Sequence, residues 1–135
     1  MKFLGIDYGD IRIGLSIAEL NIAVPFRVIK SLTMKENVDE IAKIIVSEEI
    51  DKVVIGLPLN MDGTEGRRAK KTKALGNVLG KVTGKEIFYQ DERLSSIEAD
   101  KILFEMDLKK SKKNDKSLID ILSAQLILEG YLSSK

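Results

Sequence analysis

Residues Lys2–Ser16, KFLGIDYGDIRIGLS, carry the pattern of a strand, a tight turn and a second strand. The first run is apolar and β-prone, as a buried strand requires, and Gly9 and Asp10 then suit the backbone angles of a turn. Asp7 stands at the end of the first strand, where a hydrophobic side chain would otherwise be expected. A carboxylate held rigidly at this point, yet facing solvent, suits a metal ligand or a residue of a phosphate site. A turn aspartate that bonds its own backbone is the alternative that this stretch leaves open.

The composition describes one soluble globular domain that covers residues 1–135. Of the 135 residues, 44% are hydrophobic and 32% are charged, which is enough for a single core of ordinary size. No apolar run approaches the roughly 18 residues of a membrane span, and no signal peptide is evident. The sequence contains no Cys and no His, so thiolate sites and a histidine base are excluded. Any catalysis must therefore use carboxylates, lysines, hydroxyls or a bound metal ion.

The rest of the chain predicts a third strand followed by alternating helices and strands. We expect strands over residues 12–18, 22–32, 52–57 and 87–89, and helices over 35–49, from 64 or 65 to 83, over 95–106 and over 117–133. Short links make the first three strands an antiparallel meander, and right-handed crossovers set the two later strands parallel to the first. The expected fold class is α/β, a mixed five-stranded sheet flanked by helices on both faces.

Polar side chains stand where the expected parallel strands end, and sites gather at such ends. Asp7 follows the first strand, the loop Pro58–Gly66 follows the next parallel strand, and Asp91 and Glu92 follow the last. Asp7 and Glu92 would end neighbouring strands if the first strand is central. A third acid, Asp120, lies in the first turn of the last helix, on a face that can point toward the sheet. Three carboxylates together require a hard cation, so Asp7, Glu92 and Asp120 are predicted to bind Mg²⁺ or Mn²⁺.

These acids also have purely structural interpretations. Ser117 and Asp120 match the pattern of a helix capping box, which alone would explain the aspartate. Asp91 and Glu92 could form a solvated turn or pair with Arg93, and Asp91 competes with Glu92 as the metal ligand.

The loop after residue 57 and two basic runs predict contacts with nucleic acid. Backbone amides at a helix N-terminus, a hydroxyl and two guanidiniums make a phosphate seat, although the glycine spacing is not that of a Walker A loop. A lone basic run is usually a solvated face, whereas two runs beside the acids favour a nucleic-acid footprint. The residues expected to contact the phosphate backbone are Asn60, Gly63, Thr64, Arg67, Arg68, Lys112 and Lys113.

Four blocks of the sequence together resemble one family. They are LGIDYGDIRIGLS at residues 4–16, VVIGLPLNMDGTEGRRA at 53–69, DERLSSIEA at 91–99 and IDILSAQLILEGYL at 119–132. In this order they are similar to the YqgF family, also called RuvX or the pre-16S rRNA nuclease family. The resemblance implies a ribonuclease-H-like fold, kinship with Holliday-junction resolvases, and a cytoplasmic bacterial nuclease of ribosome biogenesis that processes the 5′ end of the 16S rRNA precursor.

The same resemblance implies roles for individual residues. The three acids of the family motifs fall on Asp7, Glu92 and Asp120, and the arginine of the third block falls on Arg93, which joins the nucleic-acid-binding set. The implied enzyme is a hydrolase of phosphodiester bonds that uses Mg²⁺ or Mn²⁺, acts on nucleic acid away from any membrane, and is a monomer or a homodimer.

Three other functions remain open at this point. A branched DNA junction could be the substrate in place of RNA, and the domain could be a non-catalytic RNA-binding or ribosome-assembly module. The strand–turn–strand also resembles the phosphate hairpin of actin-like ATPases, but those proteins need two lobes, and 135 residues supply one.

Overall fold

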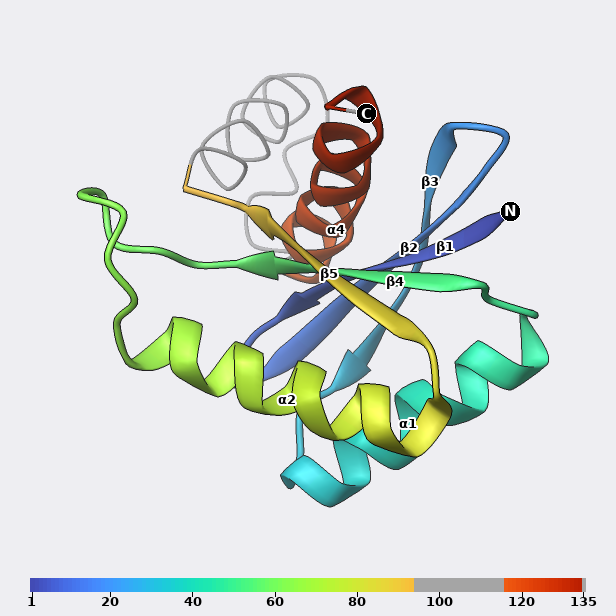
Figure 1. Ribbon diagram of the computed structural model, residues 1–135, viewed down its shortest axis with the longest axis horizontal. Coiled ribbons are helices and arrows are strands. Elements are labelled where there is room, and N and C mark those ends of the chain that lie inside the picture. Colours follow the sequence, from blue (N-terminus) through green and yellow to red (C-terminus); the bar gives the residue numbers. More distant parts are fainter. Residues whose placement is uncertain (94–115, 135) are drawn as a thin grey trace.

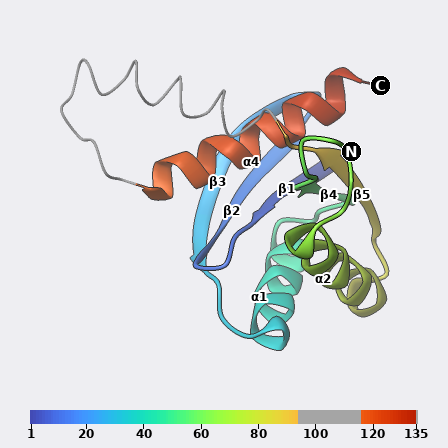
Figure 2. The same cartoon turned by 90° about the vertical axis from the view of Figure 1, so that its left-hand side faces the viewer.

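The computed structural model describes residues 1–93 and 116–134, which form one sheet with helices on both faces (Figures 1 and 2). The strands are β1 (Lys2–Tyr8), β2 (Arg12–Glu19), β3 (Ile22–Lys30), β4 (Lys52–Leu57) and β5 (Glu86–Asp91). The helices are α1 (Met34–Ser47), α2 (Arg67–Thr83) and α4 (Lys116–Ser133). The helix expected over residues 95–106 and the lysines Lys112 and Lys113 lie outside the described residues.

The sheet has the mixed topology that the sequence predicts, with the strand order β3-β2-β1-β4-β5. Strands β1, β2 and β3 form the antiparallel meander, and β4 and β5 run parallel to β1. The central position of β1 is therefore confirmed. The expectation that Asp7 and Glu92 end neighbouring strands is wrong, because β4 lies between β1 and β5.

The two faces of the sheet pack against different helices, as Figure 2 shows. Helices α1 and α2 cover one face, where alternate residues of β1, β2 and β4 build the larger core; its fully buried members include Leu4, Ile6, Ile13, Leu15, Ile41, Ile55, Leu75 and Leu79. Helix α4 covers the other face with a smaller cluster. Within the described ranges, no helix has the length and apolar character needed to cross a membrane.

Helix α4 approaches the sheet closely because the strand beneath it carries small residues. A Cβ atom added at Gly14 would lie within 3.0 Å of the backbone oxygen of Asp120, so only glycine allows this approach. One turn further along the helix, the hydroxyl of the fully buried Ser16 donates a hydrogen bond of 2.7 Å to the carbonyl of Ala124. Gly14 pairs with Asp7 in the β1–β2 ladder. The seat of α4 therefore brings Asp120 to the end of β1.

Replacing Gly14 with alanine should push α4 away from β2. Because the obstacle is helix backbone rather than a flexible side chain, we expect Gly14→Ala to lower the free energy of unfolding by about 1–3 kcal/mol, the usual cost of overpacking. Urea unfolding followed by circular dichroism measures this change. The matched control is Gly80→Ala in α2, whose added Cβ would lie 3.3 Å from Cγ1 of Ile87. Equal stability of the two variants would contradict the proposed seat.

Candidate active site

Two predicted acids meet across the strand that separates them. The carboxyl group of Glu92 lies over Gly56 of β4, where an added Cβ would come within 3.0 Å of Oε2 of Glu92 and of the Ile127 side chain. The absence of a side chain at Gly56 lets Glu92 reach Asp7, and the two carboxyl groups share a hydrogen bond. Glu92 is only 8% exposed, while Asp7 is half-buried. Asp7 and Glu92 thus form a carboxyl pair at the carboxyl-terminal edge of the parallel strands.

Burial is the main influence on the ionisation of this carboxyl pair. The pKa of Asp7 is raised to about 6, chiefly by loss of hydration and secondly by the negative charge of Asp120. Burial likewise raises the pKa of Glu92 to about 8, with the charge of Asp7 as the second cause. The positive charge of Arg68 opposes both increases in pKa. At neutral pH the pair therefore retains a proton that two ordinary carboxyl groups would have released.

The third predicted acid, Asp120, is paired with an arginine. Nε of Arg12 donates to Oδ2 of Asp120 at 2.6 Å, and the two side chains are only 29% and 22% exposed. Helix α4 begins at Lys116, so Asp120 lies just beyond the first turn rather than within it. Since Ser117 is already inside the helix, it does not precede the first turn as a capping box requires. The carboxylate of Asp120 is thus a tertiary contact from α4 to β2.

The structure does not bring Asp7, Glu92 and Asp120 together as the three metal ligands that the sequence predicts. Across residues 1–93 and 116–134, no three acidic side chains are arranged so that they could hold a metal ion together. The carboxyl pair does fit a hard cation, because its donors are oxygens and because its raised pKa values show that negative charge there lacks sufficient stabilisation. In this structure Oδ2 of Asp120 is held by Arg12 instead.

Asp91 and Arg93 form a separate ion pair, as one of the structural alternatives expected. Nε and Nη2 of Arg93 bind the Asp91 carboxylate at 2.6–3.1 Å, which holds the pKa of Asp91 below its usual range. Nη1 of Arg93 donates to the carbonyl of Met61 at 3.0 Å. Arg93 therefore braces the loop after β4 against the end of β5. Asp91 is exposed and committed to this brace, so Glu92 is the acid that joins Asp7.

In the loop that the sequence predicts to bind a phosphate, the polar side chains form hydrogen bonds with one another. Nδ2 of Asn60 donates to Oγ1 of Thr64 at 2.9 Å, and Oγ1 of Thr64 donates to Oδ1 of Asp62 at 2.6 Å. Gly63 turns the chain with a φ of 89°. The side chains of Asn60 and Thr64 therefore shape the loop, which leaves phosphate contacts to the backbone and to the arginines that follow.

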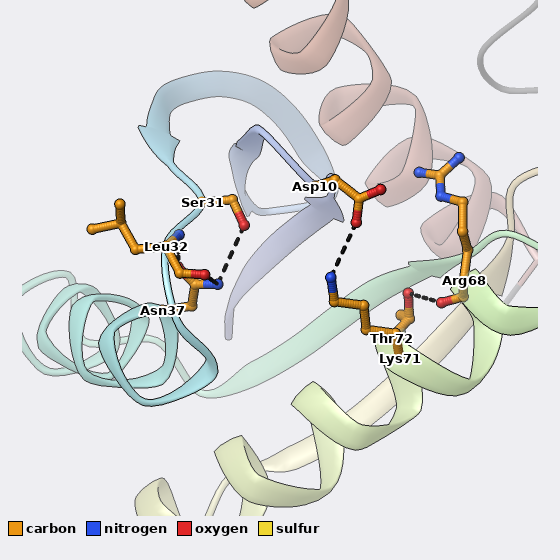
Figure 3. A network of polar contacts seen from close by, with 7 residues as sticks. All are labelled: Asp10, Ser31, Leu32, Asn37, Arg68, Lys71 and Thr72. Carbon is orange, nitrogen blue, oxygen red and sulfur yellow. Dashed lines mark hydrogen bonds and ion pairs between the residues drawn. The ribbon is translucent and has the colours of Figure 1, made fainter.

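The start of α2 supplies those arginines. Its N-cap is Gly66, which has no side chain to bind the first amides, and Arg67 and Arg68 occupy the first turn. Figure 3 shows Arg68 and Lys71 on α2, with Nζ of Lys71 3.1 Å from Oδ1 of Asp10 in the β1–β2 turn. In the described part of the chain, Arg68 forms no ion pair, although its charge acts on Asp7 and Glu92. Its guanidinium is thus available beside the carboxyl pair.

Sequence reasoning missed Arg12 and Gly56 as parts of this site. A glycine within an apolar strand is a known signal of close approach by another group, so Gly56 could have been singled out. For Arg12 no such signal exists, because an arginine at the start of a strand is usually solvated. Its pairing depends on where α4 crosses the sheet.

The comparison with protein families decides the kinship of the chain. The family model described as "RuvX: Holliday junction resolvase" matches residues 1–134. The chain belongs to the RuvX family. A RuvX relative from Carboxydothermus hydrogenoformans, named "Putative pre-16S rRNA nuclease", is 44% identical over 137 residues, which cover 100% of this chain and 98% of the relative. A relative of the same name from Halothermothrix orenii is 38% identical, with 98% and 95% covered.

Solved structures confirm the ribonuclease-H-like fold expected for a RuvX protein. Thermus thermophilus RuvC in complex with a Holliday junction substrate has a TM-score of 0.64 at 13% identity, covering 99% of this chain and 94% of that one. The fowlpox virus resolvase in complex with Holliday junction DNA has a TM-score of 0.63 at 15% identity, covering 99% and 98%. At these identities the likeness concerns the fold alone.

The carboxyl pair should make folding less favourable as the pH rises. Between about pH 4.5 and pH 8 the unfolded chain has released protons that the folded pair retains, so the free energy of unfolding falls with pH over this range. We expect Glu92→Gln to be more stable than the wild type at pH 8, with the difference vanishing toward pH 4.5. Urea unfolding in EDTA at several pH values tests this. The control is Glu40→Gln on the exposed side of α1, and a difference independent of pH would contradict the prediction.

Proposed function

We propose that this chain is a metal-dependent endoribonuclease that processes the 5′ end of the 16S rRNA precursor. The observation that carries the proposal is the carboxyl pair of Asp7 and Glu92, held close together at the carboxyl-terminal edge of the parallel strands. Membership of the RuvX family and the name shared by relatives of similar length support a nuclease and its substrate class. This activity would place the protein in the cytoplasm.

The metal ligands that we propose are Asp7, Glu92 and, once released from Arg12, Asp120. An all-oxygen donor set favours Mg²⁺ or Mn²⁺ over softer metals. When bound, such an ion supplies activation of water and stabilisation of the leaving oxygen in phosphodiester hydrolysis. The carboxyl pair provides a place where the positive charge of the ion replaces that of the shared proton. The pair would give up this proton to solvent as the site is loaded.

The phosphate backbone of the RNA would bind beside the acids, at the start of α2. Uncapped backbone amides and the guanidiniums of Arg67 and Arg68 offer donors to phosphate oxygens. The loop from Asn60 to Thr64 and its brace through Arg93 would hold that helix start in place, rather than contact the RNA through side chains. Lys112 and Lys113, which precede Asp120 in the sequence, would add positive charge for the RNA backbone.

A branched DNA junction is the second candidate substrate, because two proteins of the same fold are solved in complex with Holliday junctions. Cutting a junction symmetrically requires two sites related by a twofold axis, and hence a dimer. Cutting one strand of an RNA requires only one site. Substrate choice and oligomeric state are therefore linked.

The test is a cleavage assay on a 5′-leader fragment of the 16S rRNA precursor and on a four-way DNA junction, with Mg²⁺, Mn²⁺ or EDTA. We expect cutting of the RNA only with a divalent ion. Asp7→Asn should lower the rate by about 100-fold or more, since loss of several kcal/mol of charge stabilisation corresponds to at least that factor. Lys43→Gln on α1, on the opposite side of the sheet from α4, is the control. RNA binding without cutting under any metal would overturn the catalytic proposal, and cutting of the junction alone would replace RNA with DNA.

A further inference from the structure

The ion pair between Arg12 and Asp120 lies beside the carboxyl pair. Arg12 opens β2, whose residue Gly14 faces Asp7 in the ladder, and Asp120 lies above Gly14 on α4. Asp120 is near enough for its charge to act on Asp7. Its carboxylate nonetheless contacts Arg12, at 2.6 Å.

The backbone of Asp120 cannot move far toward or away from the sheet. Its carbonyl oxygen rests against Gly14, and the hydrogen bond from Ser16 to Ala124 fixes the next turn of α4. Any change of partner by the carboxylate must therefore be a rotation of the side chain, which is 22% exposed. Such a rotation needs no rearrangement of the fold.

We propose that Arg12 is a positioning residue that withholds Asp120 from the cation site until a phosphate group of the nucleic acid takes its place on the guanidinium. The inference rests on the proposed nuclease function. A guanidinium binds a phosphate as well as a carboxylate, often through two parallel hydrogen bonds. The exchange replaces one ion pair, arginine with aspartate, by two, arginine with phosphate and aspartate with cation.

Electrostatics explain why the exchange would couple the two ligands. A third free carboxylate beside Asp7 and Glu92 is unfavourable without a cation, and Arg12 neutralises it. Cation binding must then compete with Arg12 for Asp120. When nucleic acid occupies Arg12, that competition ends and the affinity for the cation rises. By linkage, the cation raises the affinity for nucleic acid by the same factor.

The competing view is that Arg12 only fastens α4 to β2. The helix is also held by the hydrogen bond from Ser16 and by the packing of Ile127, Leu128 and Tyr131. Loss of a mere fastener would lower stability and leave cation affinity unchanged or weaker. The proposal predicts the opposite sign, tighter cation binding when Arg12 is removed.

The test measures the dissociation constant for Mn²⁺ by calorimetry, with and without a 2′-O-methyl RNA oligonucleotide of the leader sequence that is verified to remain uncut. For the wild type we expect the oligonucleotide to tighten Mn²⁺ binding by about 5- to 150-fold, the usual range of coupling between sites. In Arg12→Gln, Mn²⁺ alone should bind nearly as tightly as it binds to the wild type with RNA. Arg27→Gln on β3, where the guanidinium lies over the Phe26 ring, is the control.

A double-mutant cycle separates the exchange from a simple loss of positive charge. If Arg12 acts through Asp120, then Arg12→Gln tightens Mn²⁺ binding in the wild type but not in Asp120→Asn. Tightening that persists in Asp120→Asn, or Arg12→Gln binding Mn²⁺ no better than the wild type, would overturn the inference. Arg12→Lys, which keeps the charge, guards against loss of folding in Arg12→Gln. Cleavage by the wild type tests the nuclease function separately, because the Mn²⁺ titrations do not depend on cutting.

Discussion

Helix α4 lies directly on strands β1 and β2 because the strand beneath it offers a glycine and a serine where larger side chains would stand. Gly14 leaves room for the backbone at Asp120, and Ser16 binds the next turn of the helix. The rest of the site depends on this contact. It sets Asp120 at the end of β1, above the ladder position that pairs with Asp7. A looser helix would leave the third acid in solvent, where neither Arg12 nor a cation could hold it.

Close packing at this edge brings three acidic side chains near one another, and their mutual repulsion is reduced in three ways. The carboxyl pair retains a proton, the charge of Asp120 is offset by Arg12, and the charge of Asp7 is moderated by Arg68. Each of these compensations is reversible. The proton can dissociate, Asp120 can exchange Arg12 for another partner, and Arg68 forms no ion pair in the described ranges. A stable fold without function would more simply bury apolar residues here. The retained acids therefore favour a site that takes up positive charge.

Much of this arrangement could be predicted from the sequence, because it follows from local patterns. Apolar strands, a capping box at Thr33 and short links between the first strands were enough to give the mixed sheet, and the ends of parallel strands located Asp7 and Glu92. What could not be predicted depends on neighbours across the sheet. Glu92 reaches Asp7 across β4 only because Gly56 has no side chain there, and Arg12 meets Asp120 only because of where α4 crosses.

The loop from Asn60 to Thr64 also differs from what its sequence predicts, because local hydrogen bonds use its polar side chains. Asn60, Thr64 and Arg93 have the chemistry of phosphate ligands, yet their hydrogen bonds are used within the chain. Short polar side chains in a turn usually form hydrogen bonds with groups two to four residues away, so they are not free to bind a ligand. Arg68 has no such partner in reach in the described chain, and it stands on a rigid helix beside the acids. The rigid arginine, rather than the polar loop that precedes it, is therefore the better donor for a phosphate at this site.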